Sequence, residues 1–521
     1  MTTVAHDPPR AAYRGVPSPF DIDDETFLAL ARQMVVDAAR YLQALPASPV
    51  YRPLPDQTRT LLRELPLPRD GADPEAILDF FQEHVLPWQR QQNHPRFSAF
   101  VDPAASRLSM LAAFWAAVMN NSGSGGDYAL IYVEETAVRW LAQLVGFPSN
   151  GSDGVLLGGG SDANRHGLEV ARFWAAQKYG WNVREEGLVG HPRLVLYGTD
   201  QRHSCIDKAA YTLGLGAPRT VETDRHFRMD LDALAEAVRA DRAAGTLPFC
   251  VVASAGTVTT GAVDPLDALA DFCEREGLWL HVDGAFGGLG AADPHLAGLY
   301  SGIERAHSLA LDPHKWLGTA IGCSCVLVRQ GDLLQATYRL VPSYLRFANG
   351  RGFAGDRWYS HRSAEQTRPT NRALMTLWNI QQAGREGVVA HVRRHIALAD
   401  YLRTRIDATP GLEIVAGGPL PVVCFRAVPE ALGGDEQGLN RFNQQVVERL
   451  QTEGAAFLGG VDIGDPERAP GAGGEIYALR YCNLHYALTE DDVEAILAEV
   501  VRVAQLCQQA HGLVHSQARK E

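Results

Sequence analysis

The sequence is poor in lysine. Only four of its 521 residues are lysines, namely Lys178, Lys208, Lys315 and Lys520, so arginine supplies nearly all of the 48 basic side chains. A coding bias that replaces surface lysine with arginine accounts for this composition. Any lysine kept in an apolar setting is therefore a candidate for chemistry.

Long apolar runs and an excess of positive charge are absent as well. No run approaches the roughly 20 apolar residues that cross a bilayer, and the opening MTTVAHDPPRAAYRG lacks the apolar stretch of a secretion signal. We therefore expect a cytoplasmic protein with no membrane partner. The net charge of -13 argues against a nucleic-acid partner, because proteins that bind phosphate backbones concentrate positive charge. Small-molecule chemistry fits this composition better.

The eight cysteines follow no recognisable pattern. Cys323 and Cys325 are separated by one residue inside an apolar run, a spacing that suits neither a disulfide framework nor a zinc site. We expect reduced, mostly buried thiols and no metal.

Strand-like and helix-like segments alternate from Gly154 onward. The apolar runs GVLLGG, RLVLYG, FCVVASAG, LWLHVDG, SLALDP and CSCVLVR are separated by helical patterns such as HGLEVARFWAAQ and PLDALADFCEREG. This alternation predicts an α/β fold with a mostly parallel central sheet that helices cover on both faces. Ligands bind such sheets at the carboxyl ends of the strands.

The other segments predict three domains. Residues 1–100 contain an amphipathic helix at about 21–45 and a Pro-rich arm that is too thin to fold alone, so we expect this part to pack across another domain or subunit. Residues 101–385 form the large ligand-binding domain. Residues 386–521 form a small C-terminal α+β domain, which a long helix from about Asn371 to Arg405 leads into.

A lysine stands at the end of one predicted strand. In SLALDPHKWLG, Lys315 lies in a turn between His314 and Trp316. Partial desolvation at such a place lowers the pKa of a lysine and frees its amine for imine formation. A snorkelling surface lysine is the alternative.

A carboxylate stands at the end of another predicted strand. In LWLHVDGAFGG, Asp283 interrupts an apolar run, and a buried carboxylate needs a cationic partner such as a pyridinium nitrogen. Gly284 and Ala285 leave room for a flat ring to approach. An aspartate that caps a turn or a helix is the alternative.

Two further segments open helices after strands. In VLLGGGSDANRHGLEVAR, the run Gly158–Gly160 permits close backbone approach, Ser161 can cap the helix, and the exposed amides form an anion site. The run matches neither the P-loop nor the GxGxxG pattern. In RLVLYGTDQRHSCIDKAA, His203 can stack on a planar cofactor or substrate, or it can simply cap its helix.

These four segments, in this order and at these spacings, resemble the group II pyridoxal-phosphate decarboxylases of fold type I. The combination of DPHKW, HVDGAFGG and SAGTVTTGAVDP carries the resemblance, which runs from about Phe20 to about Val503. The family includes decarboxylases of aromatic L-amino acids, histidine, glutamate, tyrosine and diaminobutyrate. The resemblance implies an aspartate-aminotransferase-like fold, pyridoxal 5'-phosphate as cofactor, and a homodimer with active sites at the subunit interface.

The resemblance also implies the roles of four residues around the cofactor ring. Lys315 carries the cofactor as a Schiff base, and Asp283 pairs with the pyridine nitrogen. His203 stacks on the ring, and Ala285 packs on the opposite face.

Further residues match positions that the family uses around the phosphate and the substrate. Gly160 and Ser161 fall where the family binds the phosphate, with His314 nearby, and Thr257 falls close to the cofactor. Tyr344, in a long loop that ends near residue 368, falls where the family carries the tyrosine that protonates the substrate carbon.

Tyr344 and His203 also bear on the type of reaction. Relatives that convert the amino acid oxidatively to an aldehyde often carry phenylalanine at the place of the tyrosine or lack the histidine. The presence of both residues favours simple decarboxylation of an L-amino acid to the amine and carbon dioxide. A decarboxylative oxidase or aldehyde synthase, a carbon–carbon lyase similar to sphingosine-phosphate lyase, and a non-catalytic protein of this fold are the alternatives.

The segments HPRFSAFVDPAAS and NNSGSGGDYALIY would by resemblance line the substrate pocket between two subunits. Phe97, Phe100 and Tyr128 favour an aromatic substrate. Asp102 can instead bind a cationic side chain such as that of diaminobutyrate, or it is only a turn residue before Pro103. An acidic substrate such as glutamate also stays open.

The chain departs from the family pattern at two places. Many relatives show a pattern like GRRFxALKLW, whereas TRPTNRALMTLW places Arg368 and Arg372 at a different spacing, which affects the anchoring of the loop and the choice of substrate. Asp312 stands where some relatives have asparagine near the phosphate. A carboxylate faces a phosphate unfavourably, so we expect Asp312 to accept backbone amides instead.

Overall fold

The computed structural model describes residues 18, 20–122, 126–341, 343, 359–464 and 474–510. The chain divides into two compact units, Met1–Gln91 and Gln92–Glu521. The division into three domains that we expect from the sequence stays a prediction.

The first unit is helical. Its helices are α1 (Asp24–Ala44), α2 (Asp56–Glu64) and α3 (Pro74–His84). Asp23 caps α1 by accepting a hydrogen bond from the Thr26 amide, and Asp73 caps α3 in the same way. No residue of the three helices is buried, and large apolar side chains such as Phe27, Met34 and Val35 are exposed.

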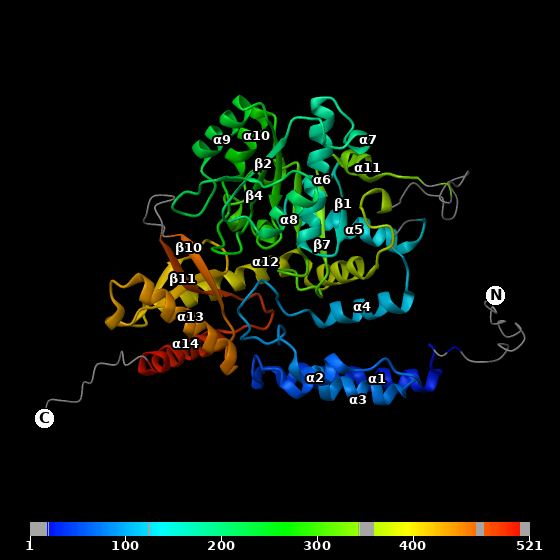
Figure 1. The fold of residues 1–521 in the computed structure, drawn as a ribbon. Helices are drawn as coiled ribbons and strands as arrows, with labels where there is room; N and C mark the ends of the chain where they lie inside the picture. Colours follow the sequence, from blue (N-terminus) through cyan, green and yellow to red (C-terminus); the bar gives the residue numbers. More distant parts are fainter. Residues whose placement is uncertain are drawn as a thin grey trace, which may run out of the picture. The chain divides into compact units, whose positions relative to one another are not determined.

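The second unit is built on a seven-stranded sheet (Figure 1). From edge to edge its strands are β1 (Asp153–Leu157), β7 (Ser324–Val328), β6 (Ser308–Leu311), β5 (Trp279–Asp283), β4 (Leu247–Ser254), β2 (Leu194–Thr199) and β3 (Arg219–Val221). β7 is antiparallel to both of its neighbours, and the other pairs are parallel. The mostly parallel sheet is therefore confirmed. The edge strand β3 was not predicted, because three residues are too few to form a recognisable apolar run.

Helices cover both faces of this sheet. Successive residues of each central strand point to opposite faces, so Val251 and Ala253 of β4 join one apolar cluster while Cys250 and Val252 join the other. The first cluster contains side chains of α5 (Ala129–Leu144), α9 (Leu231–Ala243), α10 (Leu266–Glu276) and α12 (Asn371–Asp407). The second contains side chains of α6 (Gly160–Tyr179), α8 (Ser204–Thr212) and α11 (Gly331–Tyr338).

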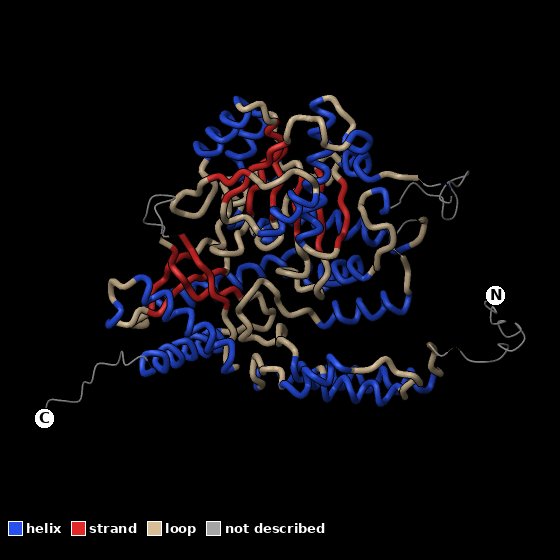
Figure 2. Tube along the Cα trace, viewed as in Figure 1, coloured by secondary structure: helices blue, strands red, loops and turns tan. Residues whose placement is uncertain are grey.

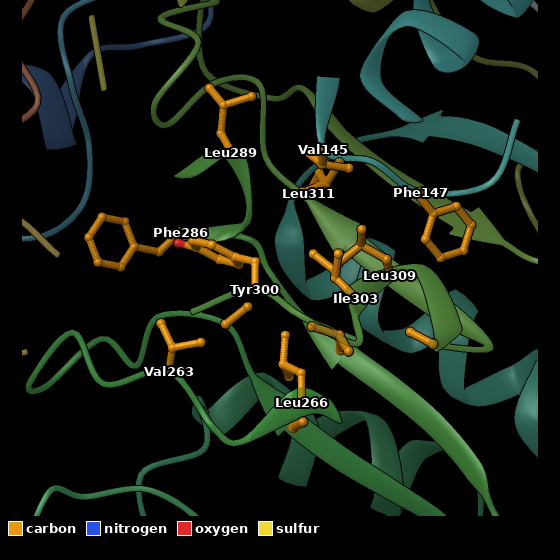
Figure 3. Close-up of a cluster of buried hydrophobic side chains, with 14 of the residues drawn as sticks. Val145, Phe147, Val263, Leu266, Phe286, Leu289, Tyr300, Ile303, Leu309 and Leu311 are labelled. Atoms are coloured by element: carbon orange, nitrogen blue, oxygen red, sulfur yellow. The ribbon is translucent and has the colours of Figure 1, made fainter. Parts of the chain in front are cut away.

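The first apolar cluster extends beneath the loop that follows β5. Figure 3 shows Phe286, Leu289 and Tyr300 packed with Leu309 and Leu311 of β6. Tyr300 donates a hydrogen bond from its hydroxyl to the Gly287 carbonyl. This packing fixes the loop that contains Ala285.

The C-terminal part forms a second, smaller sheet, which is the other group of strands in Figure 2. Its antiparallel strands, in spatial order, are β10 (Gly459–Gly464), β11 (Glu475–Cys482), β9 (Val422–Ala427) and β8 (Leu412–Ala416). The helices α13 (Glu436–Glu453) and α14 (Glu490–Ala510) pack on it through the third apolar cluster. The predicted small α+β part is therefore confirmed.

The long helix expected near residues 371–405 is interrupted. Gly384 has φ of 63° and ψ of 172°, so α12 consists of two helical segments joined at a kink. Helical periodicity continues through a single glycine, and for that reason the sequence pattern did not reveal the break.

The remaining elements are short or lie outside the two sheets. They are α4 (Arg107–Met119), α7 (Val183–Glu186) and 3-10 helices at Leu45–Ala47, Leu86–Trp88, Gly288–Ala292, Pro294–Leu296, Ile303–Arg305, Tyr359–His361 and Glu430–Leu432. Among the described residues no helix combines the length and apolar character needed to span a membrane, and no group of three metal-ligating side chains occurs. All eight cysteines are free and buried, as expected.

Two glycines with positive φ, Gly256 after β4 and Gly245 before it, test how tightly the loop after β4 is packed. Gly256 has φ of +108°, and a Cβ there would lie 2.8 Å from Leu420 Cδ1 and 2.9 Å from Gly287 Cα, whereas Gly245, with φ of +81°, has nothing within 4 Å. We expect Gly245→Ala to lower the free energy of unfolding by about 1–2 kcal/mol, the cost of a left-handed residue, and Gly256→Ala to lower it further. Urea unfolding measures both. Equal losses would show that the loop relaxes around the added methyl group.

Candidate active site

A cavity of about 300 Å³ lies at the edge of the large sheet where β1, β2, β4, β5 and β6 end. Because β7 is reversed, β1 runs in the same direction as the parallel strands, and their carboxyl ends meet there. Eight of the nine residues that the sequence singled out line this cavity: Gly160, Ser161, His203, Thr257, Asp283, Ala285, His314 and Lys315. The ninth, Tyr344, lies outside the described residues.

Lys315 follows β6 and forms an ion pair with a neighbouring carboxylate. Its ammonium nitrogen is 3.1 Å from Asp312 Oδ2, and its side chain is 17% exposed. Burial lowers the pKa of Lys315, but the charges of Asp312 and Asp283 outweigh it, so the pKa is raised above its ordinary value. The expected lowering of this pKa was wrong, because the charges of Asp312, in the same motif, and of Asp283 outweigh the apolar neighbours.

Asp283 ends β5 and is buried at the wall of the cavity. Its Oδ1 accepts a hydrogen bond from the Ala285 amide at 3.1 Å. Within the described part of the chain no cationic side chain forms an ion pair with this carboxylate. Asp283 is therefore available to a cation in the cavity.

His203 lines the cavity and also caps a helix. Its Nδ1 accepts a hydrogen bond from the Cys205 amide at 3.2 Å at the start of α8, so the capping alternative applies as well. Desolvation lowers the pKa of His203, against the opposing effect of Asp283, which favours the neutral imidazole. A neutral, flat ring is thus presented at the cavity.

The Gly-rich turn leads directly into α6. The N-cap of this helix is Gly159, and no side chain caps it, so the expectation that Ser161 is the cap was wrong. Ser161 lies one residue inside the helix. The first amides of a helix have no intrahelical acceptor, and together with the helix dipole they attract an anion.

Thr257 and His314 are held by their own loops. The Thr257 hydroxyl is 2.9 Å from that of Thr260 and accepts from the Ala262 amide at 3.1 Å. The Nδ1 of His314 is 2.6 Å from the Cys323 carbonyl, and its Nε2 is 3.7 Å from Asp312 Oδ2. The Cys323 amide lies 3.3 Å from the same nitrogen, and Nε2 faces the carboxylate.

Asp312 does not accept the backbone amides that we expected. Its side chain is 1% exposed, and among the described residues neither carboxylate oxygen has a hydrogen-bond partner of good geometry. Among the described residues it forms an ion pair with the Lys315 ammonium. Asp312 therefore does not cap the start of α6.

The two arginines of the altered pattern hold the scaffold. Arg368 is buried and donates to the Leu156 carbonyl and to Glu134, both at 2.8 Å, which covers the outer side of the edge strand β1. Arg372 donates to the Gly322 carbonyl at 3.2 Å and pairs with Glu365 at 2.9 Å. Gly322 lines the cavity, so Arg372 supports its rim.

The residues expected in the substrate pocket do not line the cavity of this chain. Phe97 stacks on Phe100 and Phe457, with ring centroids 6.2 Å and 5.1 Å apart. Tyr128 donates to the Ser122 carbonyl, and Asp102 accepts from Gln92 at 2.7 Å. Their part in substrate binding stays a prediction.

A buried series of side-chain hydrogen bonds beneath the cavity was not predicted from the sequence. Trp279 Nε1 donates to Ser308 Oγ, which is 2.8 Å from His281 Nδ1, and His281 Nε2 is 2.8 Å from Asn164 Oδ1. Burial lowers the pKa of His281 to about 4, so the ring is neutral. Its Nε2 donates to Asn164 and turns the amide nitrogen of this cavity-lining residue toward Cys205. The segment HVD, with its histidine two residues before Asp283, was the available signal.

Arg480 of β11 was missed as well. It is buried, its Nε donates to the carbonyl of Val258, which lines the cavity, and its Nη2 has no partner among the described residues. A buried cation without a carboxylate partner is costly, so it points to an anionic ligand. The motif EIYALRYC gave no local sign of this, because β11 lies far from the cavity-lining segments in the sequence.

Comparisons with known proteins place the chain in a family. Residues 55–428 match the family model described as "Pyridoxal-dependent decarboxylase conserved domain". The chain is 29% identical over 483 residues to an aromatic-L-amino-acid decarboxylase of Bacillus atrophaeus, covering 91% of this chain and 94% of the relative. It is 31% identical over 466 residues to an acidic amino acid decarboxylase of Homo sapiens, covering 86% and 85%.

The fold is also similar to solved structures. The crystal structure of Oryza sativa TDC with PLP and tryptamine superposes with a TM-score of 0.84 at 26% identity, covering 94% of this chain and 99% of that one.

The thiols provide a test of how closed the site region is. Burial, and then the charge of Asp283, raise the pKa of Cys205 far above its ordinary range, and burial raises the pKa of Cys323 to about 11. We expect none of the eight thiols of the folded chain to react rapidly with iodoacetamide at pH 8, because the thiolate is the nucleophile. Mass spectrometry counts the labels, with urea-unfolded protein as the positive control. Rapid labelling of Cys205 would contradict the burial described here.

Proposed function

Because this chain belongs to the pyridoxal-dependent decarboxylase family, we propose that it converts an aromatic L-amino acid to the corresponding amine and carbon dioxide. Decarboxylation of an amino acid with pyridoxal phosphate follows from the family and from the named relatives. The proposal adds the substrate class, the non-oxidative outcome and the roles of individual residues. It rests on one observation, the cavity in which Lys315, Asp283 and His203 meet the uncapped start of α6.

The donor set of the cavity fits pyridoxal phosphate. The cofactor has an aldehyde, a basic ring nitrogen and a phosphate, and the cavity offers an amine, an unpaired carboxylate and a free helix N-terminus for these groups. Lys315 would hold the aldehyde carbon, Asp283 the ring nitrogen and the turn Gly158–Ser161 the phosphate. His203 and Ala285 would bound the two faces of the ring.

When bound, the cofactor would supply an electron sink for the electron pair that stays on the substrate carbon when carbon dioxide leaves. Asp283 keeps the ring nitrogen protonated through its negative charge. Neutral His203 gives a flat contact without competing for that proton. We keep Tyr344 as the proton donor to the substrate carbon, on the sequence resemblance alone.

Arg480 is proposed to hold the substrate carboxylate. The support is its burial, its unpartnered Nη2 and its bond to the cavity-lining Val258. An arginine matches a carboxylate because its planar fork donates two parallel hydrogen bonds. Holding the carboxylate at a fixed angle to the ring orients the bond that breaks.

An aromatic substrate and a homodimer are proposed together. Phe100 is 48% exposed with φ of 42°, so the fold holds an aromatic ring outward in a backbone conformation unfavourable to it. The neighbouring α4 exposes a row of apolar side chains, Leu111, Phe114, Trp115, Val118 and Met119. Apolar surface of this kind marks protein interfaces, and a second copy that covers it would receive Phe100 near its own site.

The relatives bear on the substrate in two ways. The Bacillus atrophaeus relative is named for aromatic amino acids, and the Oryza sativa structure contains tryptamine, an aromatic amine. The human relative is named for acidic amino acids, which makes an acidic substrate the second candidate. Within the described residues no arginine or lysine lines the cavity apart from Lys315, so nothing there recognises a second carboxylate, and this favours the aromatic class.

Product analysis tests the reaction and the substrate class. We expect purified enzyme to release amine and carbon dioxide in equal amounts from tryptophan, tyrosine or phenylalanine, with kcat/KM at least about tenfold above that for glutamate or aspartate. Amine, aldehyde, hydrogen peroxide and carbon dioxide are followed together. Aldehyde with peroxide would replace the proposal by decarboxylative oxidation, and a preference for acidic substrates would replace the substrate class.

Lys315→Ala tests the attachment of the cofactor. We expect this variant to lose the visible absorption of the bound cofactor and all decarboxylation, because no other lysine of the described residues lines the cavity. Lys208→Ala on α8, an exposed lysine, is the matched control and should retain both. Retention of the visible band by Lys315→Ala would reject the assignment.

Arg480→Gln tests the carboxylate contact. Losing a charged hydrogen-bond pair should lower kcat/KM by roughly 10–100-fold, while binding of the amine product, which has no carboxylate, stays unchanged. Arg426→Gln on β9 of the same sheet is the control, since Arg426 is equally buried but pairs with Glu413 and Glu436. Equal weakening of amino acid and amine would show that Arg480 has only a structural role.

A further inference from the structure

One buried imidazole joins the helix α6 to the strand β5 beneath the cavity. His281 of β5 and Asn164 of α6 are both buried, and His281 Nε2 lies 2.8 Å from Asn164 Oδ1. In the described part of the chain this is the only hydrogen bond between the two elements. A Cβ added to Gly167 would lie 2.5 Å from His281 Cε1, so the imidazole also touches the backbone of the helix.

The hydrogen bonds of this imidazole run in one direction. An indole only donates, so Trp279 Nε1 donates to Ser308 Oγ at 2.8 Å. Ser308 then donates to Nδ1 of His281, which leaves Nε2–H to donate to Asn164. Burial lowers the pKa of His281 to about 4, and a neutral imidazole has the one donor and one acceptor that this arrangement needs. The ring is therefore held from both sides.

The contact between His281 and Asn164 lies close to the two groups that we propose for the ends of the cofactor. Asp283 follows His281 by two residues on β5, so both side chains point to the face of the sheet that α6 covers. Gly160 precedes Asn164 by about one helical turn, so both lie on the same side of α6. Asp283, Gly160 and Asn164 all line the cavity. The contact therefore ties the start of α6 to the end of β5.

We propose that His281 is a positioning residue that fixes the spacing between Asp283 and the start of α6, and that this spacing determines how much the phosphate adds to cofactor affinity. The inference rests on the proposed function, which assigns the ring nitrogen to Asp283 and the phosphate to the start of α6. When two parts of one ligand bind at separate points, the second contact gains from the first only if the spacing of these points matches the ligand. A helix that shifts against the strand therefore loses part of the contribution of the phosphate.

Two substitutions of His281 separate the two hydrogen bonds of the imidazole. In His281→Asn the amide lies near the place of Nδ1, so the contact with Ser308 is kept and the donor to Asn164 is lost. In His281→Gln the longer side chain reaches the place of Nε2 and keeps the donor to Asn164. Both variants replace a buried ring by a smaller side chain, so both should lower the free energy of unfolding. Only His281→Asn should release the helix.

The measured quantity is the ratio of the dissociation constant of pyridoxal, which lacks the phosphate, to that of pyridoxal phosphate. The full chain is stripped of cofactor and titrated with each compound, and the visible absorption of the bound form is followed. We expect this ratio to fall by roughly 3–10-fold in His281→Asn, the equivalent of one lost hydrogen bond, and to stay near the wild-type value in His281→Gln. The cyclic hemiacetal that pyridoxal forms in solution lowers its affinity equally for every variant and cancels in the comparison.

His485→Asn, between β11 and α14, is the matched control. His485 is buried, its Nδ1 accepts from the Ala487 amide at 3.0 Å, and its Nε2 lies 3.0 Å from the Asn93 carbonyl. The same substitution thus removes the same kind of contact outside α6 and β5, and the ratio should not change. Ser308→Ala is a second, milder variant if His281→Asn does not fold. It removes the donor to Nδ1, and the ratio should fall by a smaller factor.

An unchanged ratio in His281→Asn, or an equal fall in His281→Asn and His281→Gln, would overturn the positioning role. A role in stability alone changes the urea unfolding of both variants and leaves the ratio of the folded protein as it is. Failure of the proposed function gives different results, which would remove the premise of the inference. A wild type without a visible band would reject the assigned cofactor, and a wild-type ratio near one would reject the phosphate site at the start of α6.

Discussion

The site is organised around one ammonium group that faces two buried carboxylates. Lys315 lies 3.1 Å from Asp312 and within the electrostatic influence of Asp283, and the two charges raise the pKa of the lysine although burial lowers it. Asp312 forms the close ion pair with Lys315, whereas Asp283 forms none with a cationic side chain of the described residues. A cationic ring nitrogen in the cavity would therefore find its partner in Asp283.

The sheet makes this arrangement possible. β5 and β6 are parallel neighbours, paired from His281 with Ser308 to Asp283 with Ala310, so their ends place Asp283 and Asp312 at one edge. The edge strand β1 brings the start of α6 to the same edge, and the buried pair of Arg368 and Glu134 covers its open side. Covering an edge strand prevents it from pairing with another chain, so these two residues protect the strand that carries the anion site.

Most of the fold and of the cavity lining could be predicted because both depend on local patterns. Apolar runs of strand length, each followed by a turn with a polar residue, mark the sheet and the edge where ligands bind. Charge interactions could not be predicted in this way. The pKa of Lys315 is raised by Asp312, three residues earlier, and then by Asp283, 32 residues earlier, which only the folded sheet brings close. The helix α6 has Gly159 as its N-cap, two residues before the cap expected at Ser161.

Arg480 also could not be predicted, because its contact joins residues that are still farther apart in the sequence. Its strand belongs to the small sheet, and only the folded chain brings it behind Val258, more than 200 residues earlier in the sequence. Arg480 is identified by an unsatisfied donor. Its buried Nη2 has lost its hydration and has no hydrogen bond to the described residues in exchange. The small sheet therefore also contributes a side chain next to the cavity. It places a buried cation behind the cavity-lining Val258, and a substrate carboxylate is the partner that we propose for this cation.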